Sequence, residues 1–135
     1  MSDDKWKAIE VDLSLYKFYL ELLLKGATVA LALTGGIVSY CLANVDGSKP
    51  IKFSLILPLV VNAGFAAICW KGRSPARKLW VDHKKTCKDN GFGEGEEYDF
   101  SPLVFLVELF AAVYAVIAAG LAGLLLYLLN NAGTT

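Results

Sequence analysis

Charged residues are scarce in this chain of 135 amino acids. They make up 19% of the sequence, against about 25% in an average soluble domain, and long stretches contain none. Residues 26–45 and 53–70 carry no charged side chain, and residues 100–135 carry only Glu108. Uncharged apolar stretches of this length exclude an intrinsically disordered chain, a water-soluble enzyme and a nucleic-acid-binding module.

The sequence also lacks the residue sets that usually carry chemistry. It has one histidine, His83, so a histidine-rich metal site is excluded. His83 and Cys87 are four residues apart and could supply two ligands, but a structural zinc site needs about four. There is no glycine-rich phosphate loop, and we expect His83 on a solvated or interfacial surface, where it completes no Ser-His-Asp or Cys-His set. The sequence therefore predicts no enzyme activity, no metal and no cofactor.

Long apolar stretches are what the chain has instead, and 56% of its residues are apolar. About 20 apolar residues in a helix cross the ~30 Å hydrocarbon core of a bilayer. We therefore expect an all-α integral membrane protein, folded as a single membrane domain over residues 1–135. Its three transmembrane helices are predicted at about residues 26–44, 53–70 and 102–129.

The basic residues are unevenly divided between the segments that the predicted spans separate. Four precede the first span, two lie between the first and second, seven lie between the second and third, and none follows the third. With three spans, 11 of them fall on one side of the membrane and 2 on the other. Short loops rich in Lys and Arg stay in the cytoplasm. We therefore expect a multi-pass protein of the inner or plasma membrane, with a cytoplasmic N-terminus and the C-terminus outside.

Polar and small residues recur every three or four positions from Asp3 to Ala43. Because an α-helix has 3.6 residues per turn, this spacing predicts one continuous helix over residues 3–44. At 1.5 Å per residue this helix would be ~63 Å long, about twice the hydrocarbon thickness. Its first half is therefore expected to extend into the cytoplasm or to bend along the interface.

A second polar segment follows the second predicted span. Gly72 to Pro75 are expected to break the helix, and residues 76–90 to form a separate cytoplasmic amphipathic helix with a basic face. Residues 91–100 are expected to be a flexible acidic linker, after which Ser101 would cap the third span. A basic helix with a Trp favours the anionic headgroups of the inner leaflet, and the predicted lipid contacts are Arg77, Lys78, Trp80, Lys84, Lys85 and Lys88.

Small residues line one face of the first and third predicted spans. In lipid, helices associate where Gly, Ala and Ser allow their backbones to approach. The candidate helix-packing residues are Gly35, Gly36, Ser39, Ala111, Ala115, Ala119 and Gly123. Two interpretations stay open: these faces pack a three-helix bundle within the chain, or they bind a second copy or another membrane subunit.

Four polar residues near or within the spans are candidate intramembrane sites: Glu21, Lys25, Asn62 and Glu108. A charge inside a membrane is costly and usually has a partner, and Lys25 has the same expected depth as Glu108. We therefore predict a Lys25–Glu108 ion pair, with Glu21 and Lys25 in an i, i+4 ladder on the first helix. Asn62, nearest the membrane centre, is expected to hydrogen-bond between helices. The alternatives are a cation or proton site at Glu108 and a ligand or path at Asn62.

These features favour a small membrane protein that acts by helix–helix association, as a homo-oligomer or as an accessory subunit of a membrane complex. The expected partners are the bilayer with its anionic inner-leaflet lipids and other membrane helices, and not nucleic acid. The alternative is an ion channel or membrane-permeabilising effector, which would have to be oligomeric because three thin helices cannot enclose a wide pathway. An intramembrane enzyme ranks last.

Overall fold

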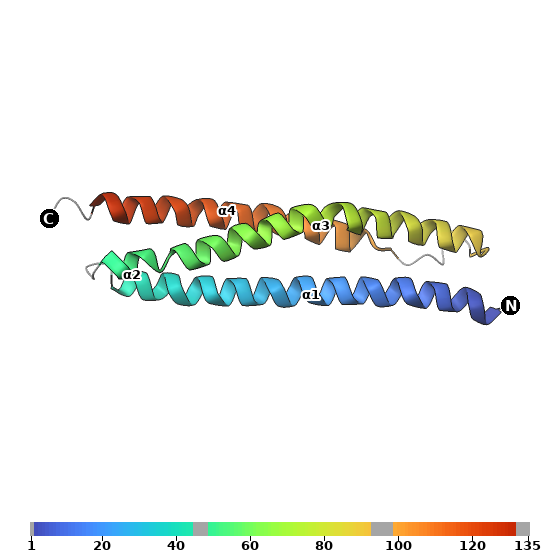
Figure 1. The fold of residues 1–135 in the computed structure, drawn as a ribbon. Helices are drawn as coiled ribbons and strands as arrows, with labels where there is room; N and C mark the ends of the chain where they lie inside the picture. The colour runs from blue at the N-terminus through green and yellow to red at the C-terminus, as the bar shows by residue number, and fades with distance from the viewer. Residues whose placement is uncertain (1, 45–48, 93–98, 132–135) are drawn as a thin grey trace.

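A computed structural model describes residues 2–44, 49–92 and 99–131. These residues form α1 (Ser2–Ala43), α2 (Lys49–Phe53), α3 (Ile56–Asp89) and α4 (Ser101–Asn131). The described chain is all-α, and its three long helices run side by side (Figure 1). Each of these three is long and apolar enough to cross a membrane, by length and composition. This finding suggests a multi-pass membrane protein, in agreement with the sequence.

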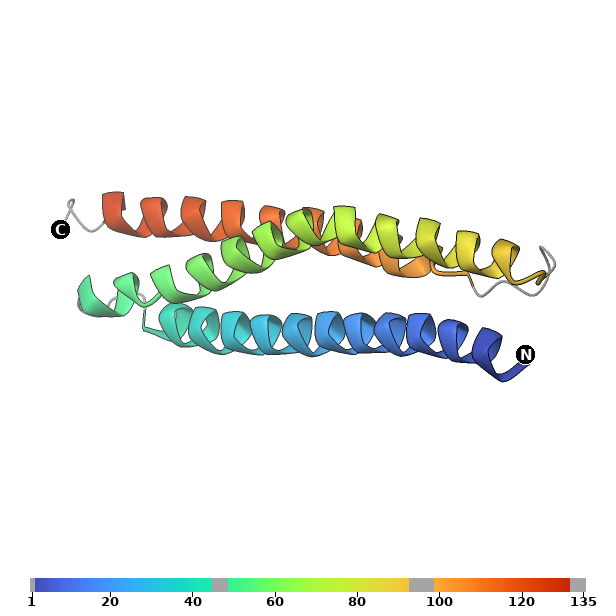
Figure 2. The same ribbon diagram turned by 45° about the vertical axis from the view of Figure 1, so that its right-hand side comes forward.

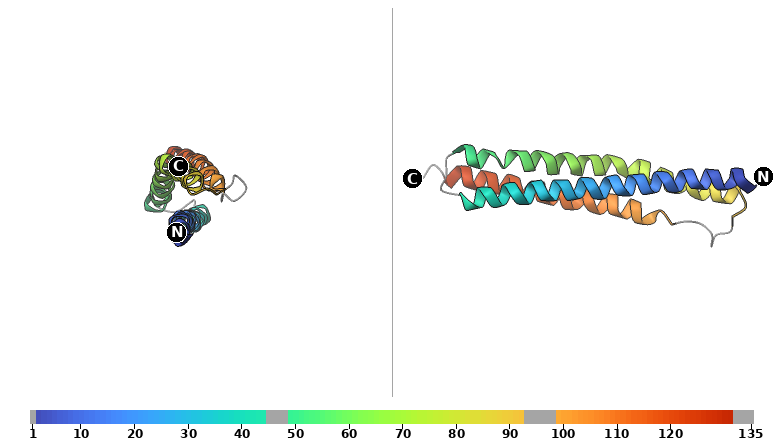
Figure 3. Two further views of the ribbon diagram at one scale, coloured as in Figure 1. Left: turned by 90° about the vertical axis from the view of Figure 1, so that its right-hand side faces the viewer. Right: turned by 90° about the horizontal axis from the view of Figure 1, so that it is seen from below.

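The long N-terminal helix is present as predicted, since α1 is continuous over 42 residues. α3 accompanies α1 along most of its length, whereas α4 begins further in from the end of the molecule that holds the N-terminus (Figures 1 and 3). At that level the ring of Tyr16 on α1 stacks on Phe100, with 4.6 Å between their centroids. The molecule is therefore a three-helix bundle at one end and an α1–α3 pair at the other, which we call the extension.

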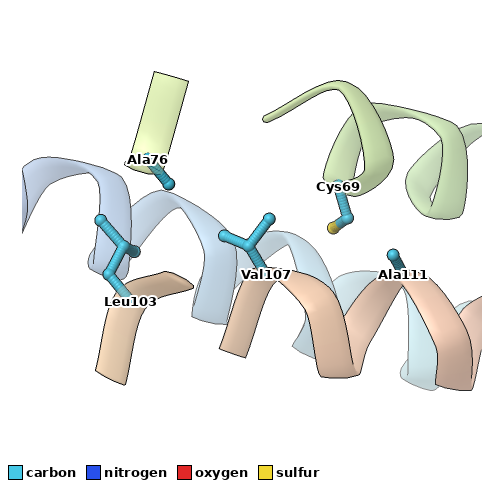
Figure 4. Packing of buried hydrophobic residues seen from close by; sticks show 5 residues of the cluster. All are labelled: Cys69, Ala76, Leu103, Val107 and Ala111. Atoms are coloured by element: carbon cyan, nitrogen blue, oxygen red, sulfur yellow. The ribbon is translucent and has the colours of Figure 1, made fainter. Parts of the chain in front are cut away.

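α3 holds the bundle together. It packs closely against α4 and also against α1, whereas α1 and α4 touch far less (Figure 2). In one core cluster, two residues of α3 meet three residues of α4 whose spacing puts them on one helix face (Figure 4). The five members of this cluster are Cys69, Ala76, Leu103, Val107 and Ala111.

The predicted helix break at residues 72–75 is wrong, because α3 continues through Pro75. A proline inside a helix removes one backbone hydrogen bond and costs about 3 kcal/mol or more. Burial on both sides of Pro75 offsets this cost, since Cys69 before it and Ala76 after it both pack in the core cluster against α4. The basic segment predicted at residues 76–90 is therefore the last part of α3 and not a separate helix.

The second span also begins differently from the prediction. After α2, the chain turns at Ser54 and Leu55, and α3 starts at Ile56. Pro58 thus lies in the first turn of α3, where a missing N–H removes no helical hydrogen bond. The carbonyl of Ser54 accepts a hydrogen bond from the backbone N–H of Leu57 at 3.3 Å.

Asp99, and not Ser101, caps the start of α4. The Asp99 carboxylate accepts hydrogen bonds from the backbone N–H and from the hydroxyl of Ser101, both at 2.9 Å. These bonds, the backbone one foremost, hold the pKa of the Asp99 carboxyl below its usual value. Most of the predicted acidic linker, residues 93–98, lies outside the described residues.

Candidate functional site

The small residues of α1 face away from the bundle. Gly35, Gly36 and Ser39 are all exposed, whereas Thr34 faces α3 and is hydrogen-bonded to Asn62. Successive helical residues are ~100° apart, so Gly36 lies about 200° around the helix from Thr34. A Cβ added at Gly35 or at Gly36 would meet nothing within 4 Å. In the part of the chain that the structure describes, this face of α1 has no packing partner.

The small residues of α4 wind from the core to the surface. Ala111 is buried against α3, but Ala115, Ala119 and Gly123 are exposed. Four residues turn a helix by about 400°, so each i+4 step carries the next residue ~40° further around, and the stripe leaves the core. Of the seven candidate helix-packing residues, Ala111 packs within the chain. For the other six, the interpretation that they pack within the chain is wrong.

Other small residues bring α1 and α3 together. Gly26 lies under the ring of Phe65, and a Cβ added to it would be 2.7 Å from Phe65 Cε2. Ala27 and Ala30 of α1 and Ala66 of α3 are buried beside that ring. Helical spacing alone does not show which side of α1 packs against α3, because both sides carry small residues four positions apart.

The predicted Lys25–Glu108 ion pair is wrong. Glu108 pairs with Arg77 of α3, and Lys25 Nζ lies 2.5 Å from Glu21 Oε1, one turn earlier on α1. Because α4 packs mainly against α3 and little against α1, the neighbouring helix supplies the partner. The side chains of Arg77 and Glu108 are 60% and 39% exposed, so this pair is reached by solvent or headgroups. The i, i+4 contact between Glu21 and Lys25 is present as predicted.

Asn62 joins α1 and α3 within the apolar part of the bundle. Its Nδ2 donates to the Thr34 hydroxyl at 2.5 Å and to the Pro58 carbonyl at 2.6 Å. The Thr34 hydroxyl donates in turn to the Ala30 carbonyl at 2.7 Å. Asn62 Oδ1 is buried and has no hydrogen-bond partner among the described residues. Asn62 therefore forms an interhelical hydrogen bond, with a partner that the sequence did not single out.

Tyr114 links α4 to α1. Its side chain is buried, and its hydroxyl donates to the Ala27 carbonyl at 2.7 Å. Its ring meets the edge of the Phe65 ring, with 4.6 Å between centroids. No sequence signal distinguishes Tyr114 from the other aromatic residues of its helix, because its partner is a backbone carbonyl.

His83 lies in the core of the molecule and not on a solvated surface, so that expectation is wrong. The side chain is fully buried, and its ring stacks on Phe100 with 4.2 Å between centroids. Nδ1 lies 3.1 Å from Oδ2 of Asp12 on α1, and Nε2 lies 3.6 Å from Sγ of Cys87. The face of residues 76–90 that carries His83 is buried because α1 packs against it. The spacing of residues within 76–90 gives no sign of this contact.

The order Cys87, His83, Asp12 is that of a thiol, a base and an orienting carboxylate. Cys87 is only 1% exposed, however, so its thiol is closed off from any substrate in this conformation. No group of three or more His, Cys, Asp and Glu residues within the described ranges is placed to hold a metal ion. The cluster is thus a buried link between α1 and α3.

The predicted headgroup contacts occupy the last part of α3. The ring of Trp80 is half-buried, 6.1 Å from that of Phe100, and Lys84 Nζ lies 4.2 Å from the centre of the Trp80 ring. Trp80 therefore packs partly against the protein, whereas the sequence predicts only a lipid contact for it. The basic members of the set are all exposed: Arg77, Lys78, Lys84, Lys85 and Lys88.

Comparisons with known proteins identify no family for this chain. No family model, no curated protein and no solved structure matches it. The geometry is therefore the guide to its function, above all the exposed small residues of α1.

Proposed function

We propose that this chain is a non-enzymatic multi-pass membrane protein that acts by helix–helix association, first of all with a second copy of itself. The observation that supports the proposal is the exposed small-residue face of α1, which we call the outward face: Ala32, Gly35, Gly36 and Ser39. Helices in lipid gain little by covering one apolar side chain with another, and they associate where small residues let backbones approach. The outward face is where a partner helix can come closest to α1.

α1 is also the least covered of the three long helices. Only 11% of its most apolar stretch is buried within the chain, against 22% in α3 and in α4. The inner side of α1 is already fixed by the Thr34–Asn62 and Tyr114–Ala27 hydrogen bonds. A partner on the outward face would therefore pack the second side of α1 and leave these contacts in place.

Two copies inserted in the same direction would pair about a two-fold axis along the membrane normal. In such a pair each residue of α1 lies near the same residue of the other copy. Gly36 and Ser39 would be close to the axis, with α3 and α4 outside it. The basic residues favour a cytoplasmic location for the extension, beside anionic inner-leaflet lipids, and the opposite side of the membrane for the end of α4.

The test compares two glycine substitutions in the purified full-length protein in mild detergent. Gly36→Leu places a large side chain on the outward face, and Gly120→Leu places the same side chain on the exposed surface of α4. A Cβ at either position meets nothing within 4 Å, so both variants should fold. We expect a wild-type mass that is a multiple of the 14.6 kDa chain, a single-chain mass for Gly36→Leu, and the wild-type mass for Gly120→Leu. A single-chain mass for the wild type would contradict self-association.

Two further measurements separate the other functions. A foreign subunit that co-purifies from native membranes in a fixed ratio, with no self-association, would support the accessory role. Ion flux from the pure protein in liposomes would support the channel alternative. The sequence of α1 favours association over a channel. Between residues 26 and 43 this helix carries no charged side chain that could line an ion path.

A further inference from the structure

An apolar groove runs between α1 and α3. It consists of two adjoining cavities of about 300 and 430 Å³, which share Phe65 and Ile68 in their walls. One end lies beside Tyr19 and Pro75, and the other lies beside Val29. Leu103 and Val107 of α4 also line the first cavity, and Lys25 is the one charged residue in the lining of the two. We call this feature the α1–α3 groove.

The α1–α3 groove has the length and direction of a lipid acyl chain. It follows α1 from Tyr19 to Ala30 and α3 from Val60 to Ala76. At 1.5 Å per residue these segments are ~16 Å and ~24 Å long, and one leaflet of the hydrocarbon core is ~15 Å thick. Because both helices are long and apolar enough to cross a membrane, the groove would stand parallel to the acyl chains of one leaflet.

The groove is narrow, because α1 and α3 are in contact along it, where Ala27 and Ala30 pack beside Phe65 and Ala66. The groove also cannot deepen without separating the helices, because Phe65 in its wall already lies against Gly26. A single extended hydrocarbon chain is slender enough to enter.

Basic residues of α3 lie next to one end of the groove. Gly72 lines this end, and its neighbours Lys71 and Arg73 lie ~100° to either side of it around the helix. Residues 71–78 hold four basic residues and no acidic one. Arg73 lies 4.0 Å from the centre of the ring of Trp70, a residue type enriched at membrane interfaces. A basic end on an apolar slot is complementary to a lipid with an anionic headgroup.

We propose that the α1–α3 groove binds one acyl chain of an anionic phospholipid, and that Lys71 and Arg73 contact its phosphate. The chain fills the space between the helices where they reach the membrane boundary. This binding requires insertion into a membrane but not self-association, so each proposal can fail without the other.

The test measures phospholipid binding to the delipidated full-length protein by native mass spectrometry, with phosphatidylglycerol as the probe. Gly72→Leu fills the groove, and Gly120→Leu adds the same side chain to α4 outside it. A Cβ at either position meets nothing within 4 Å. We expect one lipid per chain for the wild type and for Gly120→Leu, and about tenfold weaker binding for Gly72→Leu because of the steric block. Equal binding by the two variants would overturn the proposal.

The headgroup is tested separately with Lys71→Gln and Arg73→Gln combined. Their removal should weaken phosphatidylglycerol binding about tenfold, because each basic residue attracts the anionic headgroup, and should leave phosphatidylcholine binding unchanged. An unchanged preference for phosphatidylglycerol would overturn the headgroup assignment. Glycerol phosphate should not compete, since it has no acyl chain. If Gly72→Leu lowers the oligomeric mass and leaves lipid binding intact, a second copy occupies the groove and the lipid proposal is wrong.

Discussion

His83 Nδ1 and Asp12 Oδ2 lie 3.1 Å apart, and this contact joins α1 to α3 at the base of the extension. Phe100 stacks on the His83 ring just before α4 begins, so the contact is closed off from water on that side. Beyond this level α1 and α3 are the only helices among the described residues, and at the far end Lys5 Nζ donates to the Asn90 carbonyl at 3.2 Å. The Asp12–His83 contact is thus a buried polar link where the bundle narrows from three helices to two.

Replacement of Asp12 should loosen the extension. Asp12→Ala leaves the buried Nδ1 of His83 without its partner, which should lower the free energy of unfolding by about 1–3 kcal/mol. Asp4→Ala is the matched control, because Asp4 forms only an exposed pair with Lys7 at 3.8 Å, and such pairs contribute about 0–1 kcal/mol. Denaturant unfolding in micelles, followed by Trp fluorescence, measures both. Equal losses would contradict the buried link.

Asn62→Leu should weaken the contact between α1 and α3. Hydrogen bonds between helices in a membrane contribute about 0.6–2 kcal/mol, and we expect the lower part of that range because Leu also removes the unpartnered Oδ1. Thr34→Val removes the same bond from the other side. The double variant should therefore lose less stability than the sum of the two single variants. Strictly additive losses would show that the two side chains do not interact.

Glu108→Ala should lower the free energy of unfolding by less than about 1 kcal/mol. Its pair with Arg77 is partly exposed, and such pairs contribute little, whereas loss of one partner from a dry pair costs about 3–5 kcal/mol. When Lys25→Ala is combined with Glu108→Ala, the loss in free energy of unfolding should equal the sum of the two single losses, because the two residues belong to different pairs. Thermal unfolding in detergent measures both effects. A loss near 3 kcal/mol for Glu108→Ala would mean that its environment is dry.

The orientation in the membrane can be tested with introduced cysteines in intact cells. The basic residues predict that Ser48→Cys reacts with a membrane-impermeant thiol reagent added outside and that Gly93→Cys does not. The native cysteines are buried, so the wild type provides a low background. Labelling of Gly93→Cys from outside would reverse the predicted orientation.

The long helices could be predicted because they depend on local properties of the chain. The absence of charge and the helical spacing over residues 3–44 involve neighbouring residues only, and α1 follows from them. Pro75 shows where local rules stop, because the cost of a proline is offset by packing against α4, which comes later in the sequence. Ser101 is similar, since its hydroxyl is engaged by Asp99 and does not cap the helix itself.

The pairings between helices could not be predicted, because a sequence gives the depth of a residue but not its angle around the bundle. Lys25 and Glu108 have matching depths, yet each finds a nearer partner, on its own helix or on α3. Asp12 and His83 are 71 residues apart, and nothing near either one indicates the other. The sequence identifies Gly36 as a small residue, but only the fold shows that it lies on the side of α1 that faces away from α3.

Oxidative cross-linking of Ser39→Cys in native membranes tests most directly whether the outward face of α1 meets the same face of a second copy. Val116→Cys is the matched control, because Val116 is 72% exposed but lies on α4. The three native cysteines are buried, so the wild type should give no cross-link. We predict a product of twice the 14.6 kDa chain mass for Ser39→Cys and none for Val116→Cys. Equal yields from the two variants, or no product from Ser39→Cys, would contradict association through this face.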